Sequence, residues 1–564
     1  MPASVNSDDT SVKPEESGID VLALKELAKR SLLEALNSVN GSKTLVLDPS
    51  LVGPLGLVTD VAFLKQNGLD KMFWLESGPL NAPTPNIVYL CRPKIKYAKI
   101  IADHIRKHTA AGDKHIYTLI LTPRTSTLIS QVLEEEGVLG EITILPYNLQ
   151  FIPLEDDVIS LEHENAFKEI WLDGDETALY NSAQALLTLQ RLYGLFPRIL
   201  GKGEHAERLA RLLIRLNAQQ ITTPGLPVSQ GVSEKIDSLI IVERRADMVT
   251  PMLTQLTYEG LIDELVGVSN TYVELPANIV SPPSQANTSG DTTSQALNTT
   301  PVQAEKKKKR TILRMMVLAS VVSGGIKVKQ LESLKRVFLQ TYGYELLPTL
   351  LSLESLQLLQ SNPLPPSQAH LPSMKLPFTA LRKQLRLLIE ESEGGTDAMP
   401  NDISYVYSGY APLSIRLVQC VAQMNAVLAS FNASDSGKGK GKGKDVSQAS
   451  EMPKMNAHPI VGWKGFEDVI NTIPGPTVDI TQTGIESKAQ GPSLFPKEQS
   501  TTTVVFFLGG CTFTEITAIR WMAKRTRGRR FMIATTGVVS GNSLIESLLP
   551  AAKPKTAKVA GGSS

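Results

Sequence analysis

The chain has 564 residues, of which 42% are hydrophobic and 20% are charged, a composition typical of a globular protein with about three or four domains. Its net charge of +1 provides no general attraction to nucleic acid or to an acidic membrane. Its three cysteines, Cys91, Cys420 and Cys511, are far apart, which fits a reducing compartment and supports neither a disulfide framework nor a metal cluster. We expect no signal peptide and no membrane span, because no segment has the required apolar length.

Alternating strand and helix patterns predict a first α/β domain at 19–150, after a disordered tail at 1–18. An amphipathic helix at 19–36 leads through the Asn40-Gly41 turn to a strand at 44–47. The elements expected next are strands at 71–75, 86–91, 116–121 and 141–145, and helices at 94–108 and 125–136. This alternation favours a parallel sheet with helices on its faces.

A second α/β domain is predicted to be discontinuous, at 151–246 and 499–549. Its first part contains two helical patterns and the buried strand 239–243, and its second part contains strands at 503–508 and 531–535. The late strands need a sheet to join, and strand 239–243 is an available partner. A disordered tail is expected at 550–564.

The segment between the two parts, 247–498, is predicted to be a mostly helical third domain. Apolar residues at helical spacing indicate helices at 328–338, 380–389 and 414–429. Polar stretches at 277–310, 433–450 and 481–500 are predicted to be flexible linkers, including the basic run at 306–310 and a Gly-Lys alternation at 437–444.

A charged loop follows strand 239–243 and contains Glu243, Arg244, Arg245 and Asp247. Thr250 is the expected N-cap of a helix at 251–266, with Pro251 at its first position. The carboxyl end of a strand is where an α/β enzyme would bind its ligand. We favour the other interpretation, in which these charges pair with each other and orient a domain junction.

The motif search predicts no enzyme, no cofactor and no metal site. The chain has no P-loop, no Gly-x-Ser-x-Gly elbow and no His-Glu-x-x-His motif. No basic-aromatic interleaving indicates nucleic-acid binding. The alternative is an α/β hydrolase or nucleotide-binding enzyme that uses the charged cluster at 243–263, where Glu259 and Asp263 lie four residues apart and in principle bind a cation.

Several strings resemble the Sec-one/Munc-eighteen (SM) family of SNARE-binding fusion proteins, most closely its vacuolar and lysosomal branch. They include LTYEGLIDE at 256–264, PLEDDVIS at 153–160, YVYSGYAPLSIRLVQ at 405–419 and GGCTFTEI at 509–516. The resemblance runs in order from about residue 19 to 549.

The resemblance implies an arch of two parallel-sheet α/β domains and a mostly helical third domain, without catalysis. It implies vesicle docking and membrane fusion at late endosome and vacuole or lysosome, by a cytoplasmic protein that reaches these membranes through partners. The partners implied are vacuolar SNAREs, the helical-repeat tethering subunit called vacuolar protein sorting protein sixteen, and other HOPS and CORVET subunits. From motif position, the residues predicted to contact partners are Tyr258, Glu259, Asp263, Tyr407, Tyr410 and Arg416.

The chain departs from the family between 271–276 and 312–320. There the family has a long helical hairpin that cradles SNARE helices, and this chain has only the polar stretch 277–310. We therefore predict that SNARE templating is impaired, unless a gene model has dropped the hairpin. A smaller departure is Glu243, where the family usually has an aspartate.

Overall fold

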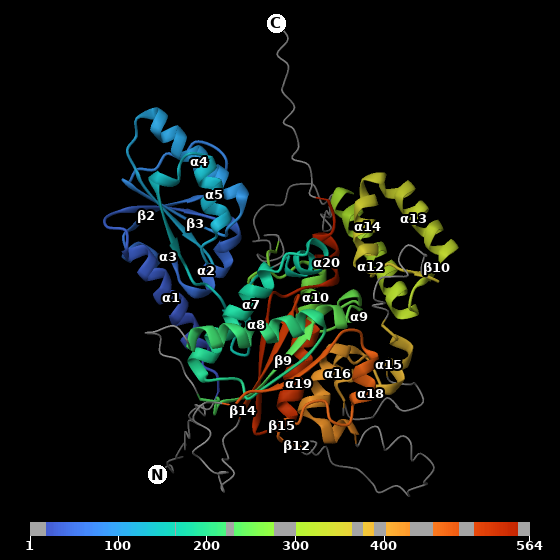
Figure 1. Cartoon of the computed structure of the whole chain (residues 1–564). Coiled ribbons are helices and arrows are strands. Elements are labelled where there is room, and N and C mark those ends of the chain that lie inside the picture. Colours follow the sequence, from blue (N-terminus) through green and yellow to red (C-terminus); the bar gives the residue numbers. More distant parts are fainter. Residues whose placement is uncertain are drawn as a thin grey trace, which may run out of the picture.

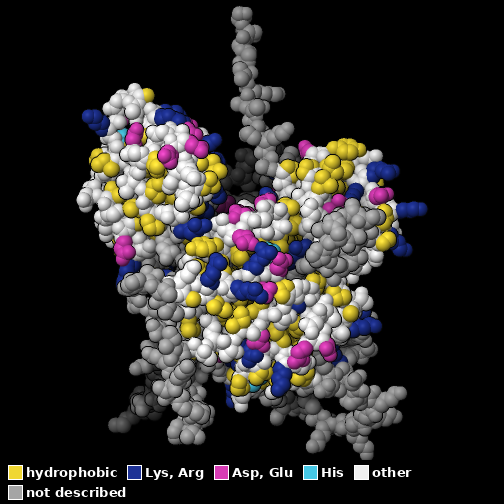
Figure 2. Space-filling view, in the orientation of Figure 1, with side chains coloured by type: hydrophobic (Ala, Val, Ile, Leu, Met, Phe, Trp, Pro, Cys, Tyr) yellow, Lys and Arg dark blue, Asp and Glu magenta, His cyan; other side chains and the backbone are white. Residues whose placement is uncertain are grey.

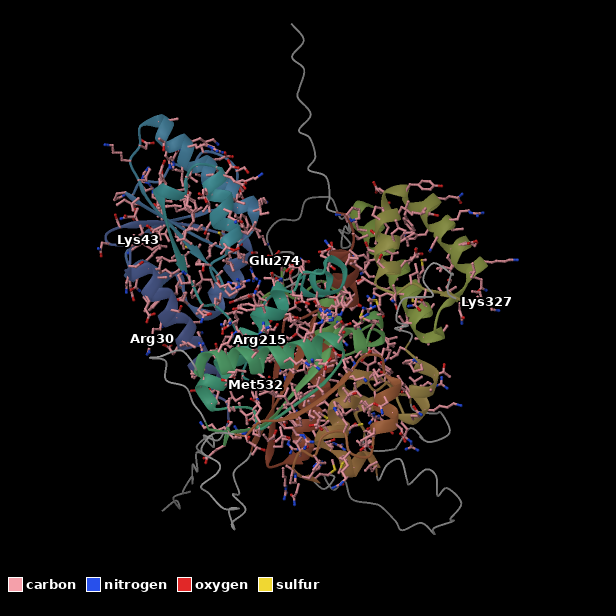
Figure 3. All side chains as sticks on the ribbon, in the orientation of Figure 1. Arg30, Lys43, Arg215, Glu274, Lys327 and Met532 are labelled. Atoms are coloured by element: carbon pink, nitrogen blue, oxygen red, sulfur yellow. The ribbon has the colours of Figure 1, made fainter. Side chains whose placement is uncertain are left out.

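The computed structural model describes residues 18–163, 165–221, 231–275, 301–363, 376–388, 402–428, 455–483 and 501–550. The first domain and a helical lobe, defined as residues 301–363, stand on either side of a central sheet domain (Figure 1). Lys43 of the first domain and Lys327 of the helical lobe therefore lie on opposite sides of the molecule (Figure 3). The predicted fold class, α/β with an additional helical part, is confirmed.

The first domain contains a parallel five-stranded sheet in the order β2-β1-β3-β4-β5. Its strands are β1 (Lys43–Leu47), β2 (Leu69–Trp74), β3 (Asn86–Cys91), β4 (Ile116–Leu121) and β5 (Ile142–Pro146). Its helices are α1 (Val21–Asn37), α2 (Val52–Val58), α3 (Val61–Gln66), α4 (Ile95–Ala111) and α5 (Thr127–Glu135). All the strands and helices predicted for this domain are present within a few residues.

Both faces of this sheet are buried, which explains why its strands are continuous apolar runs. In β3, Ile87 and Tyr89 belong to the core that α4 and α5 cover. The alternate residues Val88 and Leu90 belong to a second core together with residues of α1, α2 and α3.

The central domain contains a seven-stranded sheet in the order β13-β8-β9-β14-β16-β7-β6. Its strands are β6 (Ile152–Glu155), β7 (Val158–Ser160), β8 (Arg198–Lys202), β9 (Ile236–Glu243), β13 (Thr477–Thr481), β14 (Thr501–Leu508) and β16 (Arg529–Thr535). Strands β9 and β14 pair in parallel, with Ile240 opposite Val505, so the predicted pairing across the long insertion is confirmed. The edge strand β13 joins the same sheet antiparallel to β8, although it lies within the residues predicted for the third domain.

Helices cover both faces of the central sheet. Residues of α7 (Thr177–Tyr193) and α8 (Glu204–Ile221) share one core with Phe506 of β14. Residues of α16 (Leu413–Ala422) and α19 (Phe513–Arg525) share the other core with Phe507. The remaining short elements here are α6 (Ala166–Lys168), α15 (Phe378–Gln384), β12 (Met455–Asn456), α18 (Glu467–Thr472), β15 (Thr526–Arg527) and α20 (Gly541–Ser547).

The helical lobe contains α12 (Pro301–Ser323), α13 (Val328–Tyr342) and α14 (Leu347–Ser355), with the short strands β10 (Ile326–Lys327) and β11 (Ser361–Asn362). Leu313 of α12, Phe338 of α13 and Leu350 of α14 form its core, together with Ile545 of α20. The lobe is thus packed on the C-terminal helix of the central domain.

Part of one predicted linker is helical. Residues 301–310 were predicted to end the linker 277–310, but they form the start of α12. Glu305 pairs with Lys309 at 3.0 Å, and Arg310 pairs with Glu546 of α20 at 2.7 Å. The basic run therefore lies in the first turns of a helix, where it is exposed or half-buried, and lysine and arginine are good helix formers. Residues 276–300, the predicted linker 433–450, residues 484–500 and both predicted tails, apart from residues 18 and 550, lie outside the described residues.

Candidate partner-binding site

Arg244, which follows β9, forms a buried double ion pair with Glu515 of α19. Its Nη1 donates to Oε2 at 2.7 Å and its Nη2 donates to Oε1 at 2.9 Å, and both side chains are completely buried. Burial opposes ionisation of Glu515, but the charge of Arg244 and the hydrogen bonds from Arg244, Ser414 and Thr512 together outweigh this effect and hold the pKa of Glu515 below its ordinary value. The pair joins the two parts of the central domain across 271 positions of sequence.

Asp247 connects the same loop to α16. Its carboxylate accepts hydrogen bonds from the amide of Thr250 at 3.0 Å, the hydroxyl of Thr250 at 2.6 Å and the amide of Ser414 at 3.0 Å. Ser414 lies in the first turn of α16, and its hydroxyl donates to Glu515. Arg244 and Asp247 thus pair within the fold and link the end of β9 to α19 and α16.

Glu243 is directed to the N-terminus of α8. Its carboxylate accepts from the amide of His205 at 2.9 Å and from the indole N–H of Trp171 at 3.2 Å. Gly203 makes this approach feasible, because a Cβ there would lie 2.1 Å from Oε2 of Glu243. The charges after β9 are therefore engaged within the fold, and the alternative of an enzyme that uses this cluster gains no support.

The predicted helix at 251–266 is wrong. The structure has a short α9 (Val249–Met252) and a separate α10 (Tyr258–Leu265), whose N-cap is Thr257 instead of Thr250. The carbonyl oxygens of Met252 and Leu253 accept from Nη2 of Arg314, at 3.3 and 2.9 Å, instead of from later amides of the same helix. A tertiary contact has replaced the local helical hydrogen bonds.

Several large apolar side chains on and beside α10 lie at the surface. Tyr258 is 82% exposed and Leu265 is 68% exposed. Together with their exposed neighbours they form what we call the α10 surface: Leu256, Tyr258, Leu261, Leu265, Val266, Tyr272, Val273 and Leu275. A run of exposed apolar side chains on and after one helix is typical of a protein interaction site.

The acidic residues of α10 differ in accessibility. Glu259 is exposed beside Tyr258, and its carboxylate lies 3.9 Å from Nη1 of Arg520. Asp263 instead turns inward and accepts from the amide of Val268 at 3.1 Å, and burial raises its pKa above the ordinary value. Among the described residues, no group of three or more His, Cys, Asp or Glu side chains has an arrangement that could hold a metal ion.

Three of the predicted contact residues are internal. Tyr407 donates to the carbonyl of Thr254 at 2.6 Å, and Tyr410 is 5% exposed with its hydroxyl 3.1 Å from that of Thr250. Arg416 is 2% exposed and donates to both carboxylate oxygens of Asp402, at 2.7 and 2.6 Å. Because these side chains do not reach the surface, we propose no partner contact for them.

Sequence analysis missed a second exposed apolar area, on the helical lobe. Only part of the predicted stripe on α13 is buried, since Leu331 and Phe338 pack inward while Leu334 and Val337 are exposed. We define the lobe surface as Met315, Leu334, Val337, Tyr344, Leu347 and Leu351, all of which are exposed. Figure 2 shows hydrophobic side chains gathered over the top of this lobe. Helical periodicity alone could not separate the buried residues of the stripe from the exposed ones.

None of the helices in the part of the chain that the structure describes has the length and apolarity needed to cross a membrane.

Comparison with known proteins identifies relatives along most of the chain. The profile of the Sec1 family matches residues 43–295 and 272–547. Vacuolar protein sorting-associated protein 33A of Rattus norvegicus is 30% identical over 644 residues, which cover 94% of this chain and 98% of that protein. Vacuolar protein-sorting-associated protein 33 homolog of Arabidopsis thaliana is 28% identical over 636 residues, covering 95% and 98%. The solved structure "SM Protein Vps45 in Complex with Qa SNARE Tlg2" is 15% identical, with a TM-score of 0.44 and coverage of 94% and 98%.

The alignment with the rat protein indicates that this chain lacks internal residues. It has 644 positions, whereas 94% of 564 residues is about 530, so over a hundred positions of the rat protein have no counterpart here. The match to the family profile also divides into two pieces, which overlap at 272–295. The division falls where the family's hairpin is expected.

Proposed function

The chain belongs to the Sec1 family, and on this premise we propose that it binds SNARE proteins in vesicle docking and membrane fusion. The observation that carries the proposal is the pair of exposed apolar areas, the α10 surface and the lobe surface. SNARE segments assemble through the apolar faces of amphipathic helices, and an exposed apolar surface on packed helices is suited to hold such a face.

A rigid surface of this kind promotes SNARE assembly by ordering the segments in advance. Free SNARE segments are largely disordered and lose conformational entropy when they zipper. A surface that holds two of them in register reduces the entropy lost in the assembly step itself. We propose that the template is weakened in this chain, because over a hundred positions of the rat protein have no counterpart here and the match to the family profile divides at 272–295, between α10 and α12.

The proposed place of action is the late endosome and the vacuole or lysosome, as a subunit of the HOPS and CORVET tethering complexes. The vacuolar protein sorting names of the relatives support this location. The partner would be the helical-repeat subunit, vacuolar protein sorting protein sixteen, bound by the second and third domains. We propose no catalytic role, and membrane contact would be indirect. Failure of the purified chain to co-elute with that subunit in size-exclusion chromatography would contradict this assignment.

SNARE binding by the lobe surface is tested with two matched polar substitutions. Leu351→Ser changes an exposed residue of α14, and Leu128→Ser changes a similarly exposed residue of α5 in the first domain. Pull-down with the vacuolar syntaxin-like and synaptobrevin-like SNAREs should show reduced capture only for Leu351→Ser. Equal capture by both variants and the unmodified chain would exclude the lobe surface.

The missing segment needs a check of its own, because an incorrect gene model is the competing explanation. Sequencing the transcript across 277–312 distinguishes a natural absence from a lost exon. A transcript that encodes a hairpin in this interval would remove the reason to expect a weakened template.

A further inference from the structure

A cavity of about 250 Å³ lies at the carboxyl edge of the first sheet, where the first domain meets the second. Residues after four of the five strands line it, including Leu51 after β1, Arg92 after β3, Arg124 after β4 and Asn148 after β5. Helix α7 of the central domain forms the opposite wall and contributes Tyr180, among other residues. The cavity is therefore built from both domains.

The position of this cavity follows from the topology of the sheet. In the order β2-β1-β3-β4-β5, the direction of winding reverses between β1 and β3. Loops on the two sides of such a switch point diverge and leave a crevice, which is where doubly wound sheets bind ligands. Arg92 stands at this point, and its Nη2 donates to the carbonyl of Glu162 in the second domain at 2.7 Å.

The charged side chains that line the cavity have one sign. They are Arg92, Arg124 and Arg191, and no aspartate or glutamate is among the described residues lining it, which also include His163. Nε2 of His163 lies 2.5 Å from the carboxylate of Glu169, so the histidine is already engaged. Arg124 and Arg191 are exposed to solvent, and Nε of Arg124 donates to Oδ1 of Asn181 at 3.4 Å. Arginine is the preferred side chain for a phosphate group because its N–H groups match two of the oxygens.

The uncharged polar side chains that line the cavity indicate what other groups a bound anion would carry. Four carboxamides face the cavity, those of Asn148, Gln150, Asn181 and Gln184. Two of these groups are held in position, because Gln150 accepts from Thr188 at 2.5 Å and Gln184 donates to Tyr180 at 2.9 Å. Carboxamides both donate to and accept from hydroxyl groups. The guanidinium of Arg124 covers one face of Tyr180, 4.9 Å from the ring centroid, so this face is not open for stacking by a flat ring.

We propose that this cavity binds a phosphorylated polyol, with its phosphate groups on Arg92, Arg124 and Arg191 and its hydroxyl groups on the carboxamides. The ligand contacts both domains at once, and its binding therefore stabilises their packing. The same chemistry occurs in soluble inositol phosphates and in the headgroups of phosphoinositide lipids. The proposal is independent of SNARE binding, because none of the residues lining the cavity belongs to the α10 surface or the lobe surface.

The test uses the full chain, with inositol hexakisphosphate and unphosphorylated inositol as soluble probes in titration calorimetry. Phosphatidylcholine vesicles with and without a phosphatidylinositol phosphate serve as the lipid probe in a flotation assay. Arg124→Gln and Arg191→Gln change exposed arginines at the cavity, and Arg211→Gln changes an exposed arginine of α8 as the matched control.

We expect inositol hexakisphosphate or the phosphorylated vesicles to bind, and unphosphorylated inositol not to bind. Each cavity substitution should weaken binding about tenfold, which corresponds to about 1.4 kcal/mol, and Arg211→Gln should leave it unchanged. Binding of the soluble probe alone identifies a free phosphate as the ligand source, and binding of the vesicles alone identifies a lipid. The proposal is overturned if neither phosphorylated probe binds, or if Arg211→Gln weakens binding as much as the cavity variants do.

Discussion

Replacing Glu515 with glutamine removes the negative charge that neutralises Arg244 and preserves the size of the side chain. Both residues are completely buried, and Arg244 would keep the carbonyl oxygens of Asp247 and Gly510 as acceptors and the carboxylate of Asp247 as a more distant counterion, 4.0 Å from Nη2. Glu515 also accepts from the amide of Thr512 at 2.8 Å, a bond that the glutamine oxygen retains. The main change is therefore a buried charge that loses its closest counterion and keeps only the more distant Asp247.

Loss of one member of a buried ion pair typically costs about 3–5 kcal/mol, and we expect Glu515→Gln to destabilise the central domain by that amount. A second substitution, Arg244→Met, removes the charge that Glu515→Gln leaves without its closest counterion. The double variant should therefore be less destabilised than the sum of the single variants, with a coupling of about 1–3 kcal/mol.

Hydrogen exchange of β9 and α19, measured by mass spectrometry, reports the free energy of local opening in this large chain. Glu204→Gln is the matched control, because it removes a carboxylate from the exposed Arg208–Glu204 pair and should cost less than about 1 kcal/mol. If Glu515→Gln accelerates exchange in β9 and α19 no more than the control does, the pair does not hold the two parts of the domain together.

Three further predictions concern acid stability, a buried ion pair and the α10 surface. Burial raises the pKa of Glu515 and of Asp402, but Arg244, Arg416 and the hydrogen bonds to the two carboxylates together lower both pKa values by more. The two carboxylates contribute fully to stability above the ordinary carboxyl pKa, and this contribution is lost as the pH falls from there through their lowered pKa values in the folded state. A thermal unfolding temperature that already falls above about pH 5 would contradict this prediction. Arg416→Lys loses the two-pronged bond to Asp402 and should cost about 2 kcal/mol in thermal unfolding, and a cost under about 0.5 kcal/mol would show that the second bond is unimportant. Tyr258→Ser should change stability by less than about 0.5 kcal/mol and reduce SNARE capture, and unchanged capture would exclude the α10 surface.

The strands of the first sheet and β9, β14 and β16 of the second were predictable because a parallel sheet buried on both faces requires apolar runs, as in β3 and β14. The short strands β6, β7 and β8 were not predicted. Edge strand β13 was missed, since three of its five residues are threonine or aspartate and only Val478 is buried. The sequence also gave no sign of the break between α9 and α10. That break depends on Arg314, which lies some 60 residues further along the chain.

Among the residues predicted to contact partners, those on α10 are more exposed than those in the 405–419 string. Tyr258 and Glu259 are exposed, whereas Tyr407, Tyr410 and Arg416 are buried. Aromatic and arginine side chains occur both at interfaces and in polar cores, and their sequence spacing does not distinguish the two. Arg416 contacts Asp402, and Tyr410 contacts Thr250. These pairs become neighbours only when the chain folds.

The weakened SNARE template is the central claim, and a direct comparison with the rat relative tests it. Both purified proteins are titrated with the vacuolar syntaxin-like SNARE, the synaptobrevin-like SNARE and the two together, and binding is followed by site-specific cross-linking. We predict that this chain holds the two SNAREs together more weakly than the rat protein, which has the additional positions. Equal binding of both SNAREs by the two proteins would contradict the account.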